Sequence, residues 1–262
     1  MIPKIIHYCW LGGNPLPEIA VKCIETWKKC CPDYEIREWN ESNYDFTKQP
    51  YIKGALEAKK WGFVPDYARL DIIYQYGGIY LDTDVEVLKS FDELLGLKGF
   101  AGMEAVGRVN LGQGFGAEPF NDTIKKMRDR YEKESFCNDE EYLSQHASPF
   151  YQTEVLVGLG MVSEDKEQVV GDMHIFPTDY FCPKNIDTGI LNITRNTFSI
   201  HHFDGSWANP ITRYGYHLKW ECIEKYGVRL GRFVYKMKYG FYIIRKGGIK
   251  GLIKKIRTKS QQ

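Results

Sequence analysis

The first 90 residues alternate between apolar positions with the period of a strand and apolar positions with the period of a helix. Residues 2–13, "IPKIIHYCWLGG", form an apolar run that ends in a double glycine and predict a first strand. The segment that follows has Ile19, Cys23 and Trp27 four positions apart, which predicts an amphipathic helix over residues 15–34. The alternating stretch "YEIREWN" then predicts a second strand.

Two helices and a third strand are expected next. Residues 53–64 and 65–78 both have helical periodicity, and the second segment begins with Pro65 and ends in Gly77-Gly78. The following run "IYLDTDVEVL", residues 79–88, predicts the third strand. Because helices and strands alternate at this spacing, we expect an α/β fold with a largely parallel sheet.

The rest of the chain predicts shorter elements around this sheet. The expected elements are strands at 99–104 and 113–119, a helix at 121–136, and later strands at 173–183 and 196–207. Since no repeat or low-complexity linker precedes residue 225, we expect a single domain over residues 1–225 and a separate tail over residues 226–262.

The tail alternates aromatic and basic residues and predicts a basic amphipathic helix. Its apolar stripe has helical spacing and consists of Ile249, Leu252, Ile253 and Ile256. Its basic positions are Lys250, Lys254, Lys255 and Lys259. Such a helix suits an anionic membrane surface, and packing on the domain or a contact between copies are the alternatives. No nucleic-acid-binding motif accompanies the charge.

Charge is distributed unevenly along a chain of otherwise ordinary composition. The 262 residues are 43% hydrophobic and 26% charged, with a net charge of +1. From Val228 onward there are eleven Lys and Arg and no Asp or Glu, so the first 227 residues carry a net charge of −10. The seven cysteines form no CxxC pair, and neither a signal peptide nor a run of about 18 apolar residues is present, which indicates a cytoplasmic protein.

Two carboxylates at the end of the third predicted strand carry the clearest chemical signal. Asp82 and Asp84 lie two positions apart and therefore share one side of an extended segment. At that distance each raises the pKa of the other unless a cation binds between them, and hard oxygen ligands suit magnesium or manganese. Two solvated turn carboxylates are the alternative. Ligands of open α/β sheets bind at this end of the strands.

A second pair precedes them on the predicted helix. Asp66 and Arg69 are three residues apart and so lie on one helix face. They suit the hydroxyl groups of a polar ligand, or they form a surface ion pair.

These residues resemble a known family. The run "PDYARLDIIYQYGGIYLDTDVE" resembles the DXD-containing sugar-binding region of glycosyltransferase family 32, which includes yeast initiating mannosyltransferases and bacterial polysaccharide transferases. Clostridial glucosylating toxins share the pattern, whose positions here are Asp66, Arg69, Tyr80, Asp82 and Asp84. The opening "IPKIIHYCWLGG" and the later "HHFDGSW" are similar to the family's first and last motifs.

The resemblance implies a Rossmann-like GT-A fold, a nucleotide-sugar donor and a divalent cation, Mn²⁺ or Mg²⁺. It implies that Asp84 binds the metal, that Asp82 contacts metal, ribose or sugar, and that Asp66 and Arg69 hold the donor sugar. Trp10 is then expected near the nucleobase.

Further site residues are expected from the later motifs. One of His201 and His202 is a candidate metal ligand, because adjacent strand residues face opposite sides, with His201 slightly favoured. The hydroxyl of Ser206 and the indole of Trp207 are candidate donors to the diphosphate. In the glycine-rich run "NLGQGFGAEP", Asn110 and Gln113 are further candidates, for donor binding and catalysis.

The resemblance thus implies a metal-dependent, retaining hexosyltransferase of surface polysaccharide synthesis. Its expected donor is a UDP-sugar in preference to GDP-mannose, and its expected acceptor is a glycan or lipid-linked oligosaccharide at the inner face of the membrane. A metal-dependent nucleotidyltransferase or phosphohydrolase is one alternative. A non-catalytic membrane-binding protein with a transferase-like fold is another.

Overall fold

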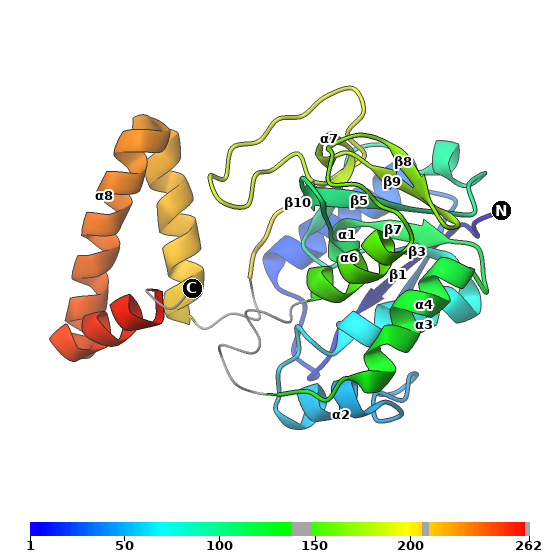
Figure 1. Ribbon diagram of the computed structural model, residues 1–262, viewed down its shortest axis with the longest axis horizontal. Helices are drawn as coiled ribbons and strands as arrows, with labels where there is room; N and C mark the ends of the chain where they lie inside the picture. Colours follow the sequence, from blue (N-terminus) through cyan, green and yellow to red (C-terminus); the bar gives the residue numbers. More distant parts are fainter. Residues whose placement is uncertain (138–147, 206–209, 260–262) are drawn as a thin grey trace. The chain divides into compact units, whose positions relative to one another are not determined.

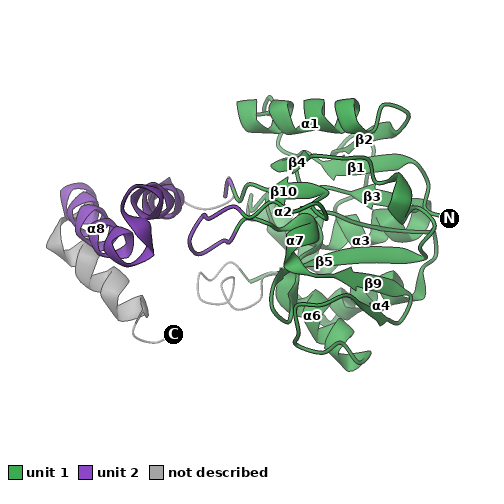
Figure 2. Cartoon of the chain, turned by 90° about the horizontal axis from the view of Figure 1, so that it is seen from above, with its two compact units in different colours: residues 1–184, 192–203 green, residues 185–191, 204–262 purple. Residues whose placement is uncertain are grey.

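The computed structural model describes residues 1–137, 148–205 and 210–259, with side chains described up to residue 246 in the last range. The chain forms two compact units (Figure 2). The first unit holds residues 1–184 and 192–203, and the second holds residues 185–191 and 204–262. The predicted boundary after residue 225 falls inside helix α8 (Pro210–Lys259) and stays a prediction.

The first unit combines short strands with helices (Figure 1). The strands are β1 (Ile5–Cys9), β2 (Glu35–Trp39), β3 (Gly78–Tyr80), β4 (Val85–Val87), β5 (Gly99–Ala105), β6 (Arg108–Val109), β7 (Phe115–Ala117), β8 (Gln168–Val170), β9 (Met173–Phe176) and β10 (Ser199–His201). The α-helices are α1 (Glu18–Cys30), α2 (Pro50–Glu57), α3 (Pro65–Tyr76), α4 (Asp122–Arg130), α6 (Ser148–Gly158) and α7 (Thr178–Phe181). The 3-10 turns are η1 (Asp92–Leu94), η2 (Leu111–Gln113) and η3 (Tyr131–Lys133).

One sheet organises the first unit, with the strand order β2-β1-β3-β7-β5-β9-β8 and β6 paired to β5. β1 pairs in parallel with β2 and β3, and β5 pairs in parallel with β9. β7 lies antiparallel between β3 and β5, so that five strands of the sheet run in one direction. This arrangement confirms the predicted α/β fold with a largely parallel sheet.

Alternate strand residues enter two apolar cores, one on each face of the sheet. Ile6 and Ile79 enter the core that α1 covers, where the buried Trp27 donates from Nε1 to the Val85 carbonyl at 2.7 Å. Tyr80 enters the other core, which α2, α3, α4 and α6 cover. The strands are therefore enclosed by helices on both faces.

The predicted third strand, residues 79–88, is two strands instead. β3 ends at Tyr80 and β4 begins at Val85, and the residues between them leave the main sheet. The strand is interrupted because its backbone changes hydrogen-bond partner after Tyr80. The Asp82 amide donates to the Gly112 carbonyl at 2.9 Å, and the Val85 amide donates to the Asp82 carbonyl at 3.1 Å. β4 then pairs antiparallel with β10 in a separate two-stranded sheet.

Two other element boundaries differ from the prediction. The helix expected at 53–64 begins at Pro50, because the Gln49 side chain accepts a hydrogen bond from the Ile52 amide, and it ends at Glu57. The strand expected at 173–183 is β9 followed by α7, with Pro177 before the helix.

The second unit consists mainly of α8, which includes the predicted tail. The stripe of Ile249, Leu252, Ile253 and Ile256 lies on helical backbone, but its side chains lie outside the described residues and the stripe stays a prediction. Within the described ranges, no helix is long and apolar enough to cross a bilayer.

Candidate active site

A buried ion triad lies at the carboxyl end of β3. Arg69 is its centre, with Nη2 2.8 Å from Asp66 Oδ1 and Nη1 3.6 Å from Asp82 Oδ1. Helical spacing places Asp66 and Arg69 on one side of the first turns of α3, where Pro65 occupies the first position. Asp66 and Arg69 are each 4% exposed, whereas the Asp82 side chain keeps 29% of its surface in solvent. The pair is therefore not a surface ion pair, and Asp82 is the most exposed member of the triad.

Burial changes the acid–base chemistry of this triad. It raises the pKa of Asp66 to about 7, although the neighbouring Arg69 opposes the change. Burial also raises the pKa of Asp82, again against the effect of Arg69. Burial thus favours the neutral form of both carboxyl groups, and the Arg69 guanidinium favours their charged form.

Tyr80 and Trp10 take different places around the triad. The Tyr80 ring is buried beneath the Arg69 guanidinium at 5.1 Å, so that it supports Arg69 and does not face solvent. Trp10 follows β1, the parallel neighbour of β3, and so lies at the same edge of the sheet. It is half-buried, and its Nε1 donates to the Asn14 carbonyl at 2.6 Å.

Gly112, which the sequence did not single out, packs directly against the triad. A Cβ atom at this position would lie 2.1 Å from Asp82 Oδ2 and 3.0 Å from Arg69 Nη1, so only glycine fits here. Asn110 fixes this turn, since its Oδ1 accepts from the Gly112 amide and its Nδ2 donates to Glu104 Oε2, both at 2.8 Å. The Asn110 side chain therefore positions the loop, and both of its polar ends already have partners.

Asp84 lies opposite His201. The Asp84 Oδ1 atom is 3.2 Å from His201 Nε2, because antiparallel pairing of β4 and β10 places His201 across from Val85. His202 faces away, with Nε2 2.9 Å from Glu86 Oε2. Burial alone would lower the pKa of His201, but the Asp84 carboxylate raises it above its usual value. The structure thus brings the His201 ring, and not the His202 ring, to the Asp84 carboxylate.

The Asp84–His201 pair has the donor types and the spacing that a divalent cation requires. Two adjacent ligands of an octahedral ion, each at about 2.1 Å, lie ~3 Å apart, close to the observed 3.2 Å. The buried His201 Nδ1 has no hydrogen-bond partner among the described residues. In the same part of the chain, no group of three or more His, Cys, Asp or Glu is arranged to hold a metal. Among the described residues, Asp84 and His201 therefore offer two ligands, and Asp82 is turned toward Arg69.

Gln113 is buried next to this loop. It has no exposed surface, and within the described residues neither atom of its side-chain amide has a hydrogen-bond partner. Its carbonyl accepts from Ser199 Oγ at 3.2 Å, which links the loop to β10. A buried polar group without partners is uncommon in native structures and needs an explanation. The remaining predicted donor-binding residues, Ser206 and Trp207, lie outside the described residues.

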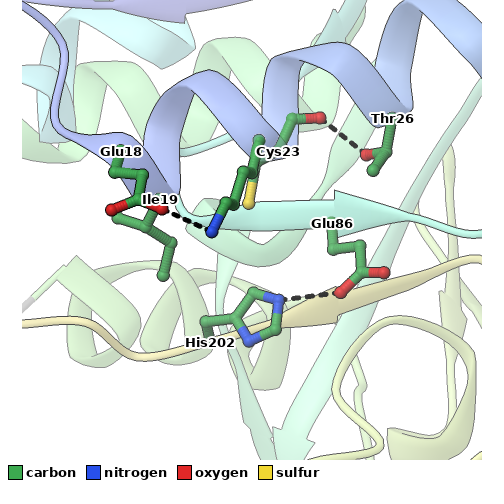
Figure 3. Close-up of a pocket in the computed structure, with 7 residues that line it drawn as sticks. Glu18, Ile19, Cys23, Thr26, Glu86 and His202 are labelled. Atoms are coloured by element: carbon green, nitrogen blue, oxygen red, sulfur yellow. Dashed lines mark hydrogen bonds and ion pairs between the residues drawn. The ribbon is translucent and has the colours of Figure 1, made fainter.

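A pocket of about 480 Å³ lies on the α1 side of the β4–β10 sheet (Figure 3). It is lined by Glu18, Ile19, Lys22, Cys23, Thr26, Glu86 and His202. Of the predicted site residues it contains only His202, whose ring faces the Glu86 carboxylate in Figure 3. The pocket is thus separate from the Asp66–Arg69–Asp82 triad.

Residues 17–100 match the protein family described as "Glycosyltransferase sugar-binding region containing DXD motif". This stretch contains Asp66, Arg69, Tyr80, Asp82 and Asp84. The match covers the stretch that carries the resemblance to glycosyltransferases, and the largely parallel α/β sheet around it is of the kind expected for a GT-A fold.

Curated relatives match more than a third of the chain. Inositol phosphoceramide mannosyltransferase 3 of Schizosaccharomyces pombe is 39% identical over 101 residues, which cover 36% of this chain and 27% of the relative. An uncharacterized glycosyltransferase of Acanthamoeba polyphaga mimivirus is 33% identical over 106 residues, which cover 38% of this chain and 42% of the relative. The chain therefore spans less than half of either relative.

Solved structures with a more distant likeness cover more of the chain. The PaToxG glycosyltransferase has a TM-score of 0.48 and 19% identity, over 60% of this chain and 69% of its own. The galactosyltransferase LgtC in complex with donor and acceptor sugar analogues has a TM-score of 0.38 and 15% identity, over 81% of this chain and 92% of its own.

We expect Gly112→Ala to lower the free energy of unfolding by about 1–3 kcal/mol, because the added methyl group displaces the Asp82 carboxylate. Gly96→Ala is the matched control, since a Cβ atom there meets nothing within 4 Å. Urea unfolding of both variants measures the difference. An equal effect of the two substitutions would show that the Gly112 contact does not constrain the site.

Proposed function

We propose that the protein is a glycosyltransferase that moves a hexose from a nucleotide-sugar donor to an acceptor hydroxyl. The observation that carries this proposal is the buried Asp66–Arg69–Asp82 triad within the matched sugar-binding region. Carboxylates held by a buried guanidinium keep fixed directions, so they suit the recognition of sugar hydroxyls. A nucleotidyltransferase or phosphohydrolase needs paired carboxylates but leaves Asp66 and Arg69 without a role.

Each residue of the site has a proposed role in binding the donor. Asp82, which is partly exposed, accepts hydrogen bonds from the sugar or ribose, and Asp66 and Arg69 hold the sugar's other hydroxyls. Trp10 lies beside the nucleobase. Ser206 and Trp207 donate to the diphosphate and stabilise the negative charge that develops as it leaves.

Asp84 and His201 are the proposed ligands of a divalent cation, Mn²⁺ or Mg²⁺. A carboxylate oxygen and an imidazole nitrogen at 3.2 Å support this role. When bound, such an ion neutralises charge on the leaving diphosphate.

The transfer is proposed to retain the anomeric configuration of the donor. No carboxylate among the described residues stands out as a covalent nucleophile, and Asp82 itself faces Arg69. The acceptor hydroxyl would attack from the side of the departing diphosphate, and its proton would pass to a diphosphate oxygen. A β-linked product from an α-linked donor would exclude this mechanism.

The acceptor is proposed to be a glycan or a lipid-linked oligosaccharide of surface polysaccharide synthesis. The similarity to a mannosyltransferase of inositol phosphoceramide supports an acceptor carried on lipid. A UDP-sugar is the preferred donor over GDP-mannose. The eleven basic residues from Val228 onward support a peripheral location at the inner face of the membrane.

The donor site predicts that a nucleotide sugar raises the melting temperature only when Mn²⁺ is present. His201→Gln should abolish this metal-dependent shift, whereas His202→Gln should keep it, because only the His201 ring lies next to the Asp84 carboxylate. Thermal shift against UDP-sugars and GDP-mannose, each with and without Mn²⁺, measures the effect. A shift that both variants retain, or one that needs no metal, would contradict the assignment of the ligands.

Gln113 is proposed to act beside the reacting sugar. This role would explain why a buried side-chain amide without a hydrogen-bond partner is present at this position. Gln113→Met should raise the free energy of unfolding by about 1–3 kcal/mol, because it removes an unsatisfied buried group, and should lower turnover at least tenfold. The control is Gln152, which is equally buried but bonds to Ser148 and to the Leu111 amide. Gln152→Met should destabilise the fold. Full turnover in Gln113→Met would remove the proposed role.

A further inference from the structure

The second unit contains a helical hairpin whose second arm exposes large apolar side chains between basic ones. Gly227 has a φ of +74° and bends α8 into two arms, residues 210–226 and 228–246 (Figure 1). The arms pack together, since the Tyr239 hydroxyl donates to the Ile211 carbonyl at 3.1 Å and the rings of Tyr214 and Tyr242 lie 4.3 Å apart. The hairpin thus fixes which side of the second arm faces outward.

That outward side is a continuous apolar stripe, which we call the hairpin stripe. It consists of Leu230, Phe233, Met237, Phe241 and Ile244, all exposed by 39–70%. The spacing of three and four residues places all five on one side of a helix. Large apolar residues gathered in this way mark an interaction surface, because isolated proteins rarely expose them together.

Basic residues lie on both sides of the hairpin stripe. Helical periodicity places Arg229 and Lys236 on one flank and Lys238 and Arg245 on the other. All four are exposed, and residues 228–246 contain no Asp or Glu. An apolar stripe between two rows of cations matches a surface with an apolar interior and anionic headgroups.

We propose that the hairpin stripe is a membrane-docking surface that enters the headgroup region of an anionic lipid leaflet. Phe233, Met237 and Phe241 insert, and the flanking cations bind lipid phosphates. The inference rests on the proposed transferase only in that a lipid-linked acceptor gives the docking a purpose. A second copy of this chain fits less well, since two stripes would bring like charges together. Nucleic acid would leave the apolar side chains unexplained.

The test is flotation of the full-length chain with vesicles of phosphatidylglycerol and phosphatidylcholine, and with vesicles of phosphatidylcholine alone. The triple variant Phe233→Ser, Met237→Ser, Phe241→Ser should lower partitioning into the anionic vesicles at least about 100-fold. Val169→Ser is the matched control, because Val169 is 64% exposed on β8 of the first unit and should leave partitioning unchanged.

Neutralising the flanks tests the electrostatic part separately. In the triple variant Arg229→Gln, Lys236→Gln, Lys238→Gln, partitioning into anionic vesicles should fall about fivefold per removed charge. Partitioning into neutral vesicles should not change. Lys28→Gln with Lys29→Gln, two exposed lysines of α1, should have no effect. Point variants are preferred to truncation after Tyr226, which would expose the buried Leu218 and Cys222 of the first arm.

Two results would overturn the proposal. One is wild-type vesicle binding in both triple variants, which would assign the binding to another surface. The other is no vesicle binding by the wild type together with a dimer that the serine variant dissociates, which would make the stripe a contact between copies. The metal-dependent thermal shift with nucleotide sugar should persist in the serine variant, so that loss of docking is distinguished from loss of the donor site.

Discussion

The guanidinium of Arg69 is the interaction on which the site depends. A buried cation is costly unless it is paired, and Arg69 pairs with two carboxylates from different parts of the chain. It thereby joins the first turns of α3 to the segment that leaves β3, and it rests on the Tyr80 ring. Gly112 completes the arrangement because its missing side chain leaves room for Asp82. The position of each side chain in this cluster therefore depends on contacts with its neighbours.

The break in the strand between β3 and β4 also places Asp84 opposite His201. Once the Asp82 amide bonds to Gly112, the chain turns and continues as β4, outside the main sheet. Pairing with β10 then places His201 against Asp84 and sends His202 to the opposite side, toward Glu86. The triad proposed to bind the sugar and the pair proposed to bind the metal therefore lie close together along the chain because the strand is interrupted.

Helix-boundary residues and helical spacing predicted the part of the site that lies on α3. Pro65 and the double glycine marked α3 almost to the residue, and the three-residue spacing placed Asp66 beside Arg69. Signals of this kind could not reveal the break after Tyr80, because it depends on a bond between distant segments. They could not reveal the engagement of Asn110 by Glu104 either, because no periodicity marks a single side-chain hydrogen bond. The choice between the two histidines depends on strand register. Gly227, which folds the tail into a hairpin, resembles any other helix glycine in sequence.

The central claim is that Asp66, held by Arg69, recognises the sugar of the donor and not its nucleotide. The most direct measurement is the affinity of Asp66→Asn for a nucleoside diphosphate and for the matching nucleotide sugar, both with Mn²⁺, compared with the wild type. We predict that the affinity for the nucleotide sugar falls at least tenfold while the affinity for the nucleoside diphosphate is unchanged. Equal losses for the two ligands, or no loss for either, would contradict the account.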